Sequence, residues 1–165
     1  MRQIPVAVFT VLLVVIIPGH LTHAQFHTNW DAPFLYECPL GLVLKSIHSV
    51  HDNRKEDRRW RFGCGIAASG CKLRACHWTD YVNWWDAPMN FVCPANYVIS
   101  GLQSYHDNHR EDRRFKFKCC SHRHYITYSC SLTGYINNWD AVLNYNVPRG
   151  HVLTGVAGVH DNRKE

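Results

Sequence analysis

Hydrophobic and polar residues alternate in three short stretches that lie far apart in the chain. In the first stretch, Phe34, Tyr36 and Cys38 fall on one side, and Leu35 and Glu37 fall on the other. The matching apolar positions of the other two stretches are Met89, Phe91 and Cys93, and then Leu143, Tyr145 and Val147. A period of two is typical of a half-buried β-strand. Prolines follow each stretch and predict where it ends, at Pro39, Pro94 and Pro148.

A second strand is predicted after each proline. In the first unit it covers residues 42–50 and includes the apolar Val43 and Ile47. The positions in phase with these two are Val98 and Leu102 in the second unit and Val152 and Val156 in the third. One matched position is small in all three units, as Ser46, Gly101 and Gly155. A small residue is expected there because another backbone approaches closely.

A third strand is predicted after a charged loop in the first two units. Its polar side carries Arg59, Arg61 and Gly63 in the first unit. Its apolar side carries Trp60, Phe62 and Cys64, and in the second unit Phe115, Phe117 and Cys119. By the same parity, Arg58 and Arg113 fall on the apolar side. An arginine in that position requires a carboxylate partner to offset its desolvation.

The charged loop itself recurs and defines the repeat. It begins with His-Asp-Asn at residues 51, 106 and 160, a period of about 55 residues, which indicates one supersecondary unit used three times. We expect one all-β, disulfide-bonded domain over residues 25–165, with repeats at about 29–65, 84–120 and 138–165. A β-prism of three sheets is the first expectation for its fold and a β-trefoil the second. The third repeat lacks its last strand, and we expect that strand in a C-terminal continuation of the chain.

Residues 1–24 are predicted to be a signal peptide that is removed. Arg2 provides the positive start, residues 4–17 are an apolar run too short to span a bilayer comfortably, and residues 22–24 form an acceptable cleavage site. The formal net charge of the full chain is +5. This mildly basic charge favours anionic extracellular polymers over nucleic acid as partners, and nothing indicates membrane insertion.

The chain has eight cysteines, which in a secreted domain are expected to form disulfides. Cys38 and Cys64 are spaced like Cys93 and Cys119, so two equivalent bridges are predicted. Cys120 points to the opposite strand face from Cys119 and is expected to pair with Cys76, although a Cys93–Cys120 bridge stays open. Cys71 and Cys130 are left over, to pair with cysteines of the expected last strand or, without that strand, with each other.

The repeated loop concentrates polar groups that suit several kinds of chemistry. As turn caps, Asp52, Asn53 and Asp57 would accept backbone hydrogen bonds. As a ligand site, the loops would present carboxylates and amides to sugar hydroxyls, and arginines to sulfates or carboxylates. The candidate ligand-binding residues are His51, Asp52, Asn53 and Glu56, then His106, Asp107, Asn108 and Glu111, and finally His160, Asp161 and Asn162.

Other chemistry fits the loop less well. Its spacing is not that of a calcium loop, its histidines are not at zinc-ligand spacing, and we expect no metal and no cofactor. No catalytic residues are predicted, because a catalytic centre is one asymmetric constellation whereas the polar groups here are repeated three times.

Two hexapeptides, residues 57–62 and 112–117, resemble the Asp-Arg-x-Trp-x-Phe/Tyr repeats of the dermatopontin family. The motif positions are Asp57, Arg58, Trp60 and Phe62, and then Asp112, Arg113, Phe115 and Phe117. The adjacent Cys119 and Cys120 and residues 128–133 support the resemblance, which covers essentially all of residues 25–165. The His-Asp-Asn loops are most similar to the haemagglutinin/amebocyte aggregation factor members.

The resemblance implies a secreted, non-enzymatic protein of the extracellular matrix. Family members bind collagen and proteoglycans and promote cell adhesion, or they agglutinate cells. We therefore expect a cell-adhesion or collagen-organising protein that binds matrix proteins and acidic glycans, with a lectin-like haemagglutinin of innate defence as the alternative. Two departures matter: the long acidic, tyrosine-rich N-terminal segment of vertebrate dermatopontin is absent, and Phe115 replaces the motif tryptophan.

Overall fold

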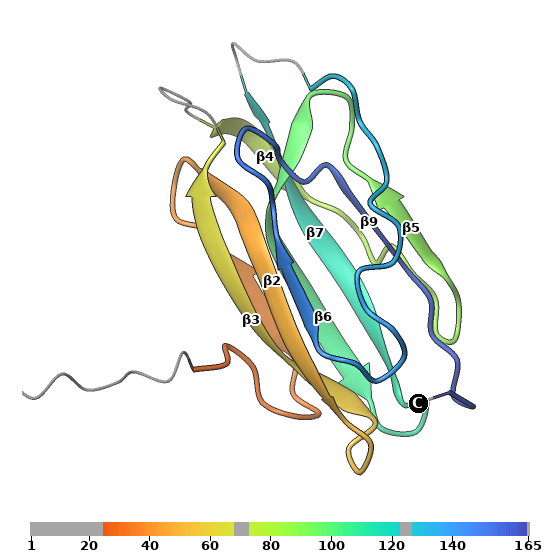
Figure 1. Ribbon diagram of the computed structural model, residues 1–165. Helices are drawn as coiled ribbons and strands as arrows, with labels where there is room; N and C mark the ends of the chain where they lie inside the picture. The colour runs from red at the N-terminus through yellow and green to blue at the C-terminus, as the bar shows by residue number, and fades with distance from the viewer. Residues whose placement is uncertain (1–24, 68–72, 123–126, 165) are drawn as a thin grey trace, which may run out of the picture.

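The computed structural model describes residues 25–67, 73–122 and 127–164, and all regular elements within them are β-strands (Figure 1). The strands are β1 (Phe34–Glu37), β2 (Leu42–Asp52), β3 (Asp57–Ile66), β4 (Leu73–Trp78), β5 (Met89–Val92), β6 (Tyr97–Asp107), β7 (Asp112–His122), β8 (Leu143–Asn146) and β9 (Gly155–Gly158). The predicted all-β class is confirmed. None of the described residues form a helix of the length and apolarity that crossing a membrane requires.

The strands form three antiparallel sheets, in the orders β1-β6-β7-β4, β3-β2-β8 and β5-β9. Each sheet joins two repeats, because the short first strand of one repeat pairs with the long second strand of the next. β1 pairs with β6, β5 pairs with β9, and β8 pairs with β2. The third repeat thus contacts the first, and the three repeats form a closed ring. This pairing is compatible with the predicted prism of three sheets. The connector strand β4, which was not predicted, extends the four-stranded sheet by pairing with β7.

The core lies between the sheets and consists mainly of aromatic rings, aliphatic side chains and disulfides. Phe34 is buried while its neighbour Leu35 is 62% exposed, as the alternation predicted. The rings of Tyr36 and Phe62 lie 4.9 Å apart, and those of Phe91 and Phe117 lie 5.0 Å apart. Ring pairs at these separations add to the stability that burial of their area provides.

A β-bulge in β2, and another in β6, changes which side chains of these strands face the core. The register of β2 with β3 shifts between Leu44 and Ser46, and β6 with β7 shifts at the equivalent place. Because a bulge inserts one residue, it reverses the alternation beyond it. Leu44 therefore joins the core cluster against which Ile47 packs. Val43 is fully buried but lies outside that cluster.

The small residues next to the bulge do lie against another backbone. A Cβ added at Gly101 would lie 2.8 Å from the carbonyl oxygen of Tyr36, and one added at Gly155 would lie 2.5 Å from that of Phe91. Both carbonyls belong to the short strand of the preceding repeat. The close approach predicted from the sequence is confirmed at these two glycines.

Three disulfides connect the strands, namely Cys38–Cys64, Cys93–Cys119 and Cys76–Cys120. The first two occupy equivalent positions in repeats one and two, and the third attaches β4 to β7. Cys130 is exposed and forms no disulfide within the described residues, and Cys71 lies outside them.

Candidate functional site

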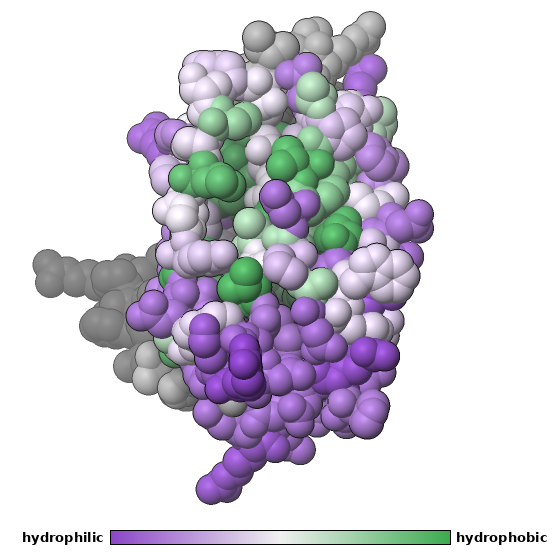
Figure 2. All heavy atoms as spheres, turned by 90° about the vertical axis from the view of Figure 1, so that its right-hand side faces the viewer, coloured by the Kyte–Doolittle hydropathy of each residue, from purple (hydrophilic) through white to green (hydrophobic). Residues whose placement is uncertain are grey.

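The three repeated loops lie at one end of the molecule. They are the β2–β3 turn, the β6–β7 turn and the segment after β9, all at the lower end in Figure 1. Figure 2 shows that this end is almost uniformly hydrophilic, whereas apolar side chains emerge on the face above it. The loops therefore contribute to one composite surface, which we call the polar end, and do not form three separate sites.

The first aspartate of each loop caps its own turn. The Asp52 side chain accepts a hydrogen bond from the backbone N–H of Arg54 at 2.9 Å. Asp107 and Asp161 accept the equivalent bonds, from His109 at 2.9 Å and from Arg163 at 3.1 Å. These contacts are the turn caps that one of the sequence interpretations described.

The loop histidines are turned inward and face carboxylates of the preceding repeat. The side chain of His106 is only 1% exposed, with Nδ1 3.5 Å from Asp57 Oδ1 and Nε2 4.0 Å from Asp31 Oδ1. His51, 3% exposed, lies 3.6 Å from Asp140 of the third repeat. Each histidine thus joins its own repeat to the one before it in the ring.

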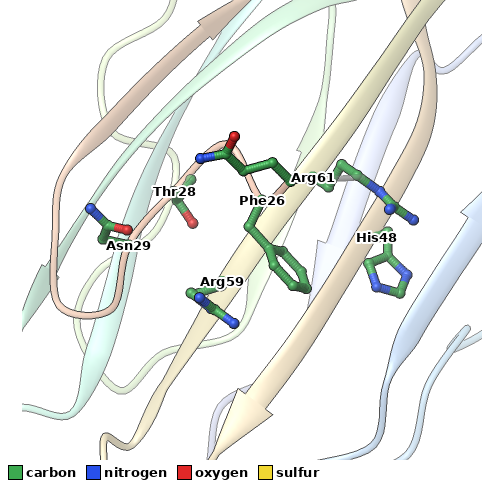
Figure 3. A pocket seen from close by; sticks show the side chains of 7 residues that line it. Phe26, Thr28, Asn29, His48, Arg59 and Arg61 are labelled. Carbon is green, nitrogen blue, oxygen red and sulfur yellow. The ribbon is translucent and has the colours of Figure 1, made fainter. Parts of the chain in front are cut away.

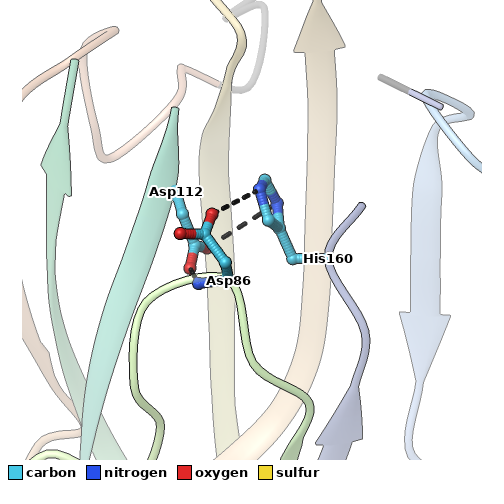
Figure 4. A group of neighbouring side chains, drawn as sticks. All are labelled: Asp86, Asp112 and His160. Carbon is cyan, nitrogen blue, oxygen red and sulfur yellow. Dashed lines mark hydrogen bonds and ion pairs between the residues drawn. The ribbon is translucent and has the colours of Figure 1, made fainter. Parts of the chain in front are cut away.

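The third such contact groups Asp86, Asp112 and His160 (Figure 4). His160 Nε2 lies 3.6 Å from Asp86 and its Nδ1 lies 3.8 Å from Asp112. Burial raises the pKa of the Asp112 carboxyl, against the opposing effects of the backbone N–H groups of Asp86 and Arg113 and of His160. The two ring nitrogens thus face different carboxylates of the second repeat, while Nε2 also contacts the side-chain oxygen of Asn162 in its own loop.

Arginines reinforce the same boundaries between repeats. Arg113 binds Asp57 through Nε at 2.5 Å and Nη2 at 2.7 Å, and also donates to the Ala32 carbonyl. The inward arginine with a carboxylate partner is therefore confirmed at this position. Arg58 donates to the Ala141 carbonyl at 3.0 Å. The two arginines thus make the same kind of contact at successive boundaries.

The loop amides and glutamates lie closer to the surface of the polar end. Asn53 donates to Asp140 at 3.3 Å, and Asn162 donates to Asp86 at 3.4 Å. Glu56 and Glu111 have φ values of 44° and 52°, in the left-handed region that few residues other than glycine adopt. Asp31, Asp86 and Asp140 are left-handed as well, so the special backbone geometry is also repeated.

A small cleft of about 270 Å³ lies between the first and second loops, and we call it the loop cleft. It unites four of the predicted site residues with three others. Its lining residues are Asp31, Arg54, Lys55, Glu56, His106, Asn108 and Glu111. Its charges are mixed, and Lys55 lies 3.7 Å from the Asp31 carboxylate. A cleft with internally balanced charge and an amide suits neutral hydroxyl groups better than a strongly charged ligand.

A larger and more open recess of about 520 Å³ lies on the outer side of β2 and β3, and we call it the first groove. Residues 25–30 run beside β3 and complete it, with the backbone N–H of His27 donating to the Trp60 carbonyl at 2.7 Å. Figure 3 shows the Phe26 ring between Arg59 and the pair His48 and Arg61. The lining residues are Gln25, Phe26, Thr28, Asn29, His48, Arg59 and Arg61.

The first groove is electropositive and partly aromatic. The Arg59 guanidinium lies 4.6 Å from the centre of the Phe26 ring and 4.9 Å from that of Trp30, and its Nε is buried without a hydrogen-bond partner. Burial lowers the pKa of His48, and the Arg61 charge lowers it further. None of the groove-lining residues is acidic.

Sequence reasoning missed the first groove. The alternation correctly placed Arg59 and Arg61 on the polar side of their strand, but no site was predicted there. Phe26 precedes the first repeat, and nothing local to it indicates that residues 25–30 run beside β3. A second pair of cations, Arg114 and Lys116 at the same repeat positions, was the available signal.

A family model described as Dermatopontin matches residues 28–165 of the chain. No solved structure gives a significant match. The "Hemagglutinin/amebocyte aggregation factor" of Limulus polyphemus is 44% identical over 156 residues, which cover 93% of this chain and 89% of that protein.

Two further relatives are similar over most of the chain. "Millepora cytotoxin-1" of Millepora dichotoma is 38% identical over 147 residues, covering 88% of this chain and 65% of that protein. The "Dermatopontin" of Biomphalaria glabrata is 35% identical over 129 residues, covering 78% of this chain and 85% of that protein. The resemblance seen in the sequence motifs is thereby confirmed, and the chain belongs to the dermatopontin family.

Proposed function

We propose that this is a secreted, non-enzymatic protein of the extracellular matrix that binds matrix proteins and acidic glycans and promotes cell adhesion or collagen matrix organisation. The observation that carries the proposal is the first groove, in which Arg59, Arg61 and His48 surround an aromatic ring and no acidic side chain takes part. Family membership and the three disulfides agree with an extracellular role.

The chemistry of the first groove favours sulfate or carboxylate groups carried on a sugar. Guanidinium groups form paired, charge-assisted hydrogen bonds with such anions. Among the described residues Arg59 Nε has no hydrogen-bond partner, so no existing bond of this atom competes with a ligand for the guanidinium. The Phe26 ring beside it offers an apolar surface for the C–H face of a pyranose. A recess of about 520 Å³ has room for one segment of a polymer.

The test is binding of a sulfated glycosaminoglycan by the purified protein and by the variant Arg59→Gln/Arg61→Gln. We expect the variant to lose at least about tenfold in affinity, because each charge-assisted hydrogen bond contributes roughly 1.5–3 kcal/mol. The matched control is Arg54→Gln/Lys55→Gln, which removes the same charge from the loop cleft. Equal losses in both variants would show that only net charge matters, and the first groove would then not be the site.

The second candidate function is that of a lectin-like haemagglutinin or cell-aggregation factor in innate defence, and the loop cleft favours it. In this candidate the exposed Asn53, Asn108, Glu111 and Asn162 contact sugar hydroxyls, while the buried His51, His106 and His160 hold the loops in place. Glu56 lines the same cleft, and Asp52, Asp107 and Asp161 keep the turns in shape.

Agglutination of erythrocytes with and without competing neutral sugars separates the two candidates. A lectin gives agglutination that a specific neutral sugar inhibits and that Asn108→Ala/Glu111→Asn abolishes. Asparagine is chosen at position 111 because it tolerates a left-handed backbone. If agglutination responds to sulfated polymers alone and survives this double substitution, the lectin candidate fails.

A further inference from the structure

The segment beside β7, in the four-stranded sheet, repeats the construction of the first groove. Residues 79–85 run beside β7 as residues 25–30 run beside β3. The backbone N–H of Val82 donates to the Phe115 carbonyl at 2.9 Å, as His27 donates to Trp60 at 2.7 Å. Side chains cap both segments in the same way, with Asn83 accepting from the Phe115 N–H at 2.9 Å where Thr28 accepts from that of Trp60 at 2.8 Å.

The side chains on this edge also correspond, one repeat later. The Arg114 guanidinium lies 4.6 Å from the centre of the Tyr81 ring, the same separation as between Arg59 and Phe26. The Lys116 ammonium lies 4.6 Å from the same tyrosine ring and stands where the first repeat has Arg61. Arg114 is held in place by the bond from its Nε to the Asn83 carbonyl at 2.9 Å. Within the described residues, no carboxylate forms a salt bridge with Arg114 or Lys116.

Several substitutions distinguish this edge from the first groove. Trp84 replaces Asn29, Gln103 replaces His48, and the acidic Asp80 replaces Gln25. The Trp84 side chain lies 4.7 Å from the Arg114 guanidinium and the residue is 71% exposed. A large indole that is kept exposed beside two cations presents a flat apolar surface next to positive charge. The first groove presents a recess instead.

We propose that Tyr81, Trp84, Arg114 and Lys116, which we call the second groove, form a second site for acidic saccharides. An anionic group binds Arg114 and Lys116 while the apolar face of a neighbouring pyranose ring stacks on Trp84. The two grooves lie on different sheets, so one chain engages two saccharide segments and cross-links them without forming an oligomer. This inference rests on the proposed binding of acidic glycans and assigns that function a second, different site.

The test uses a size-defined heparin oligosaccharide, long enough for one groove, and its fully desulfated form as the control probe. Titration calorimetry is expected to give two sites per chain for the wild type and one site for Arg114→Gln/Lys116→Gln. Trp84→Ala removes only an exposed side chain and is expected to weaken one of the two sites by about tenfold. Cross-linking requires both sites. Aggregation of heparin-coated beads should therefore be lost in Arg59→Gln/Arg61→Gln and also in Arg114→Gln/Lys116→Gln.

The outcomes separate this inference from the proposed function. A wild type that binds one oligosaccharide, lost in Arg59→Gln/Arg61→Gln and unaffected by Trp84→Ala, overturns the second groove and leaves the proposed function intact. A wild type that binds neither probe, or binds both equally, overturns the acidic-glycan function itself. Circular dichroism of each variant shows whether a lost site reflects lost folding. If Arg114→Gln/Lys116→Gln is unfolded, Trp84→Ala decides: unchanged affinity at both sites overturns the second groove.

Discussion

The Arg113 guanidinium binds both carboxylate oxygens of Asp57, at 2.5 and 2.7 Å, across the boundary between the second repeat and the first. Both residues are buried, with Arg113 5% and Asp57 3% exposed. Asp57 also accepts the backbone N–H of Asp31 at 2.7 Å, so the pair fixes the Trp-Asp-Ala turn as well. The contact therefore joins two loops and two sheets at once.

Replacing Arg113 by methionine is expected to destabilise the protein by about 3–5 kcal/mol, because the Asp57 carboxylate is then buried without its partner. Urea unfolding with the disulfides intact measures the change. Arg163→Met is the control, since the Arg163 side chain is 90% exposed and its ion pair with Asp161 contributes little. Losses of similar size in both variants would contradict the importance of the buried pair.

Alanine is expected to have opposite consequences at two glycines of the same strand. At Gly155 the new Cβ would meet the Phe91 carbonyl oxygen at 2.5 Å, so Gly155→Ala should cost about 1–3 kcal/mol. At Gly158 the nearest atom is Met89 Cε at 3.7 Å, an ordinary contact, so Gly158→Ala should be neutral or slightly stabilising. Thermal unfolding of the two variants makes the comparison. A stable Gly155→Ala protein would mean that β5 and β9 pair less closely than described.

The stability of the protein should carry a pH dependence from Asp112. Its pKa is raised in the folded state, mainly by burial, from an ordinary value of 3.8. Between pH 3.8 and this raised pKa, the folded protein therefore holds more protons than the unfolded chain. The contribution of Asp112 to stability accordingly falls as the pH rises from below 3.8 through the raised pKa.

Asp112→Asn removes this dependence, so the melting temperature of the wild type relative to this variant should decrease as the pH rises through the window. Asp161→Asn should give the opposite slope, because the backbone N–H of Arg163 lowers the pKa of the exposed Asp161. Parallel melting curves for all three proteins across the acidic range would contradict the assignment.

Binding of a sulfated oligosaccharide to the first groove should strengthen as the pH falls below 6.5, the ordinary pKa of histidine. Burial and Arg61 hold the pKa of His48 below that value in the free protein. A bound sulfate favours the imidazolium, so binding takes up a proton. His48→Gln, which copies Gln103 of the second groove, should abolish the extra gain in affinity on acidification. Calorimetry at several pH values measures it, and an unchanged pH profile in His48→Gln would refute the role of His48.

The sequence predicted those parts of the structure that depend on local pattern. Alternation located Phe34 and Phe62 in the core, and equal spacing identified Cys38–Cys64 and Cys93–Cys119 as equivalent bridges. The parity of Arg113 predicted a carboxylate partner. The strand pattern could not identify the partner as Asp57 of the first repeat, because this contact depends on which repeats lie side by side in the fold.

Other features depend on contacts that a single chain pattern does not encode. The bulge after Leu44 reverses the alternation without any change in the apolar spacing. The histidines were candidates for ligand contact, yet His51 is buried against Asp140 of the third repeat and His106 against Asp57 of the first. The two grooves arise where residues before a repeat run beside its last strand, and only the fold shows that adjacency.

The ring of exchanged strands has a consequence for how the protein acquires its structure during synthesis. β2 borders β8, with Ser46 opposite Asn146, so the first repeat cannot complete its sheet until β8 has been synthesised. Bringing such distant segments together costs chain entropy before the contacts between them can stabilise the fold. Folding is therefore expected to be slow and all-or-none, with early half-rings exposing unpaired strand edges.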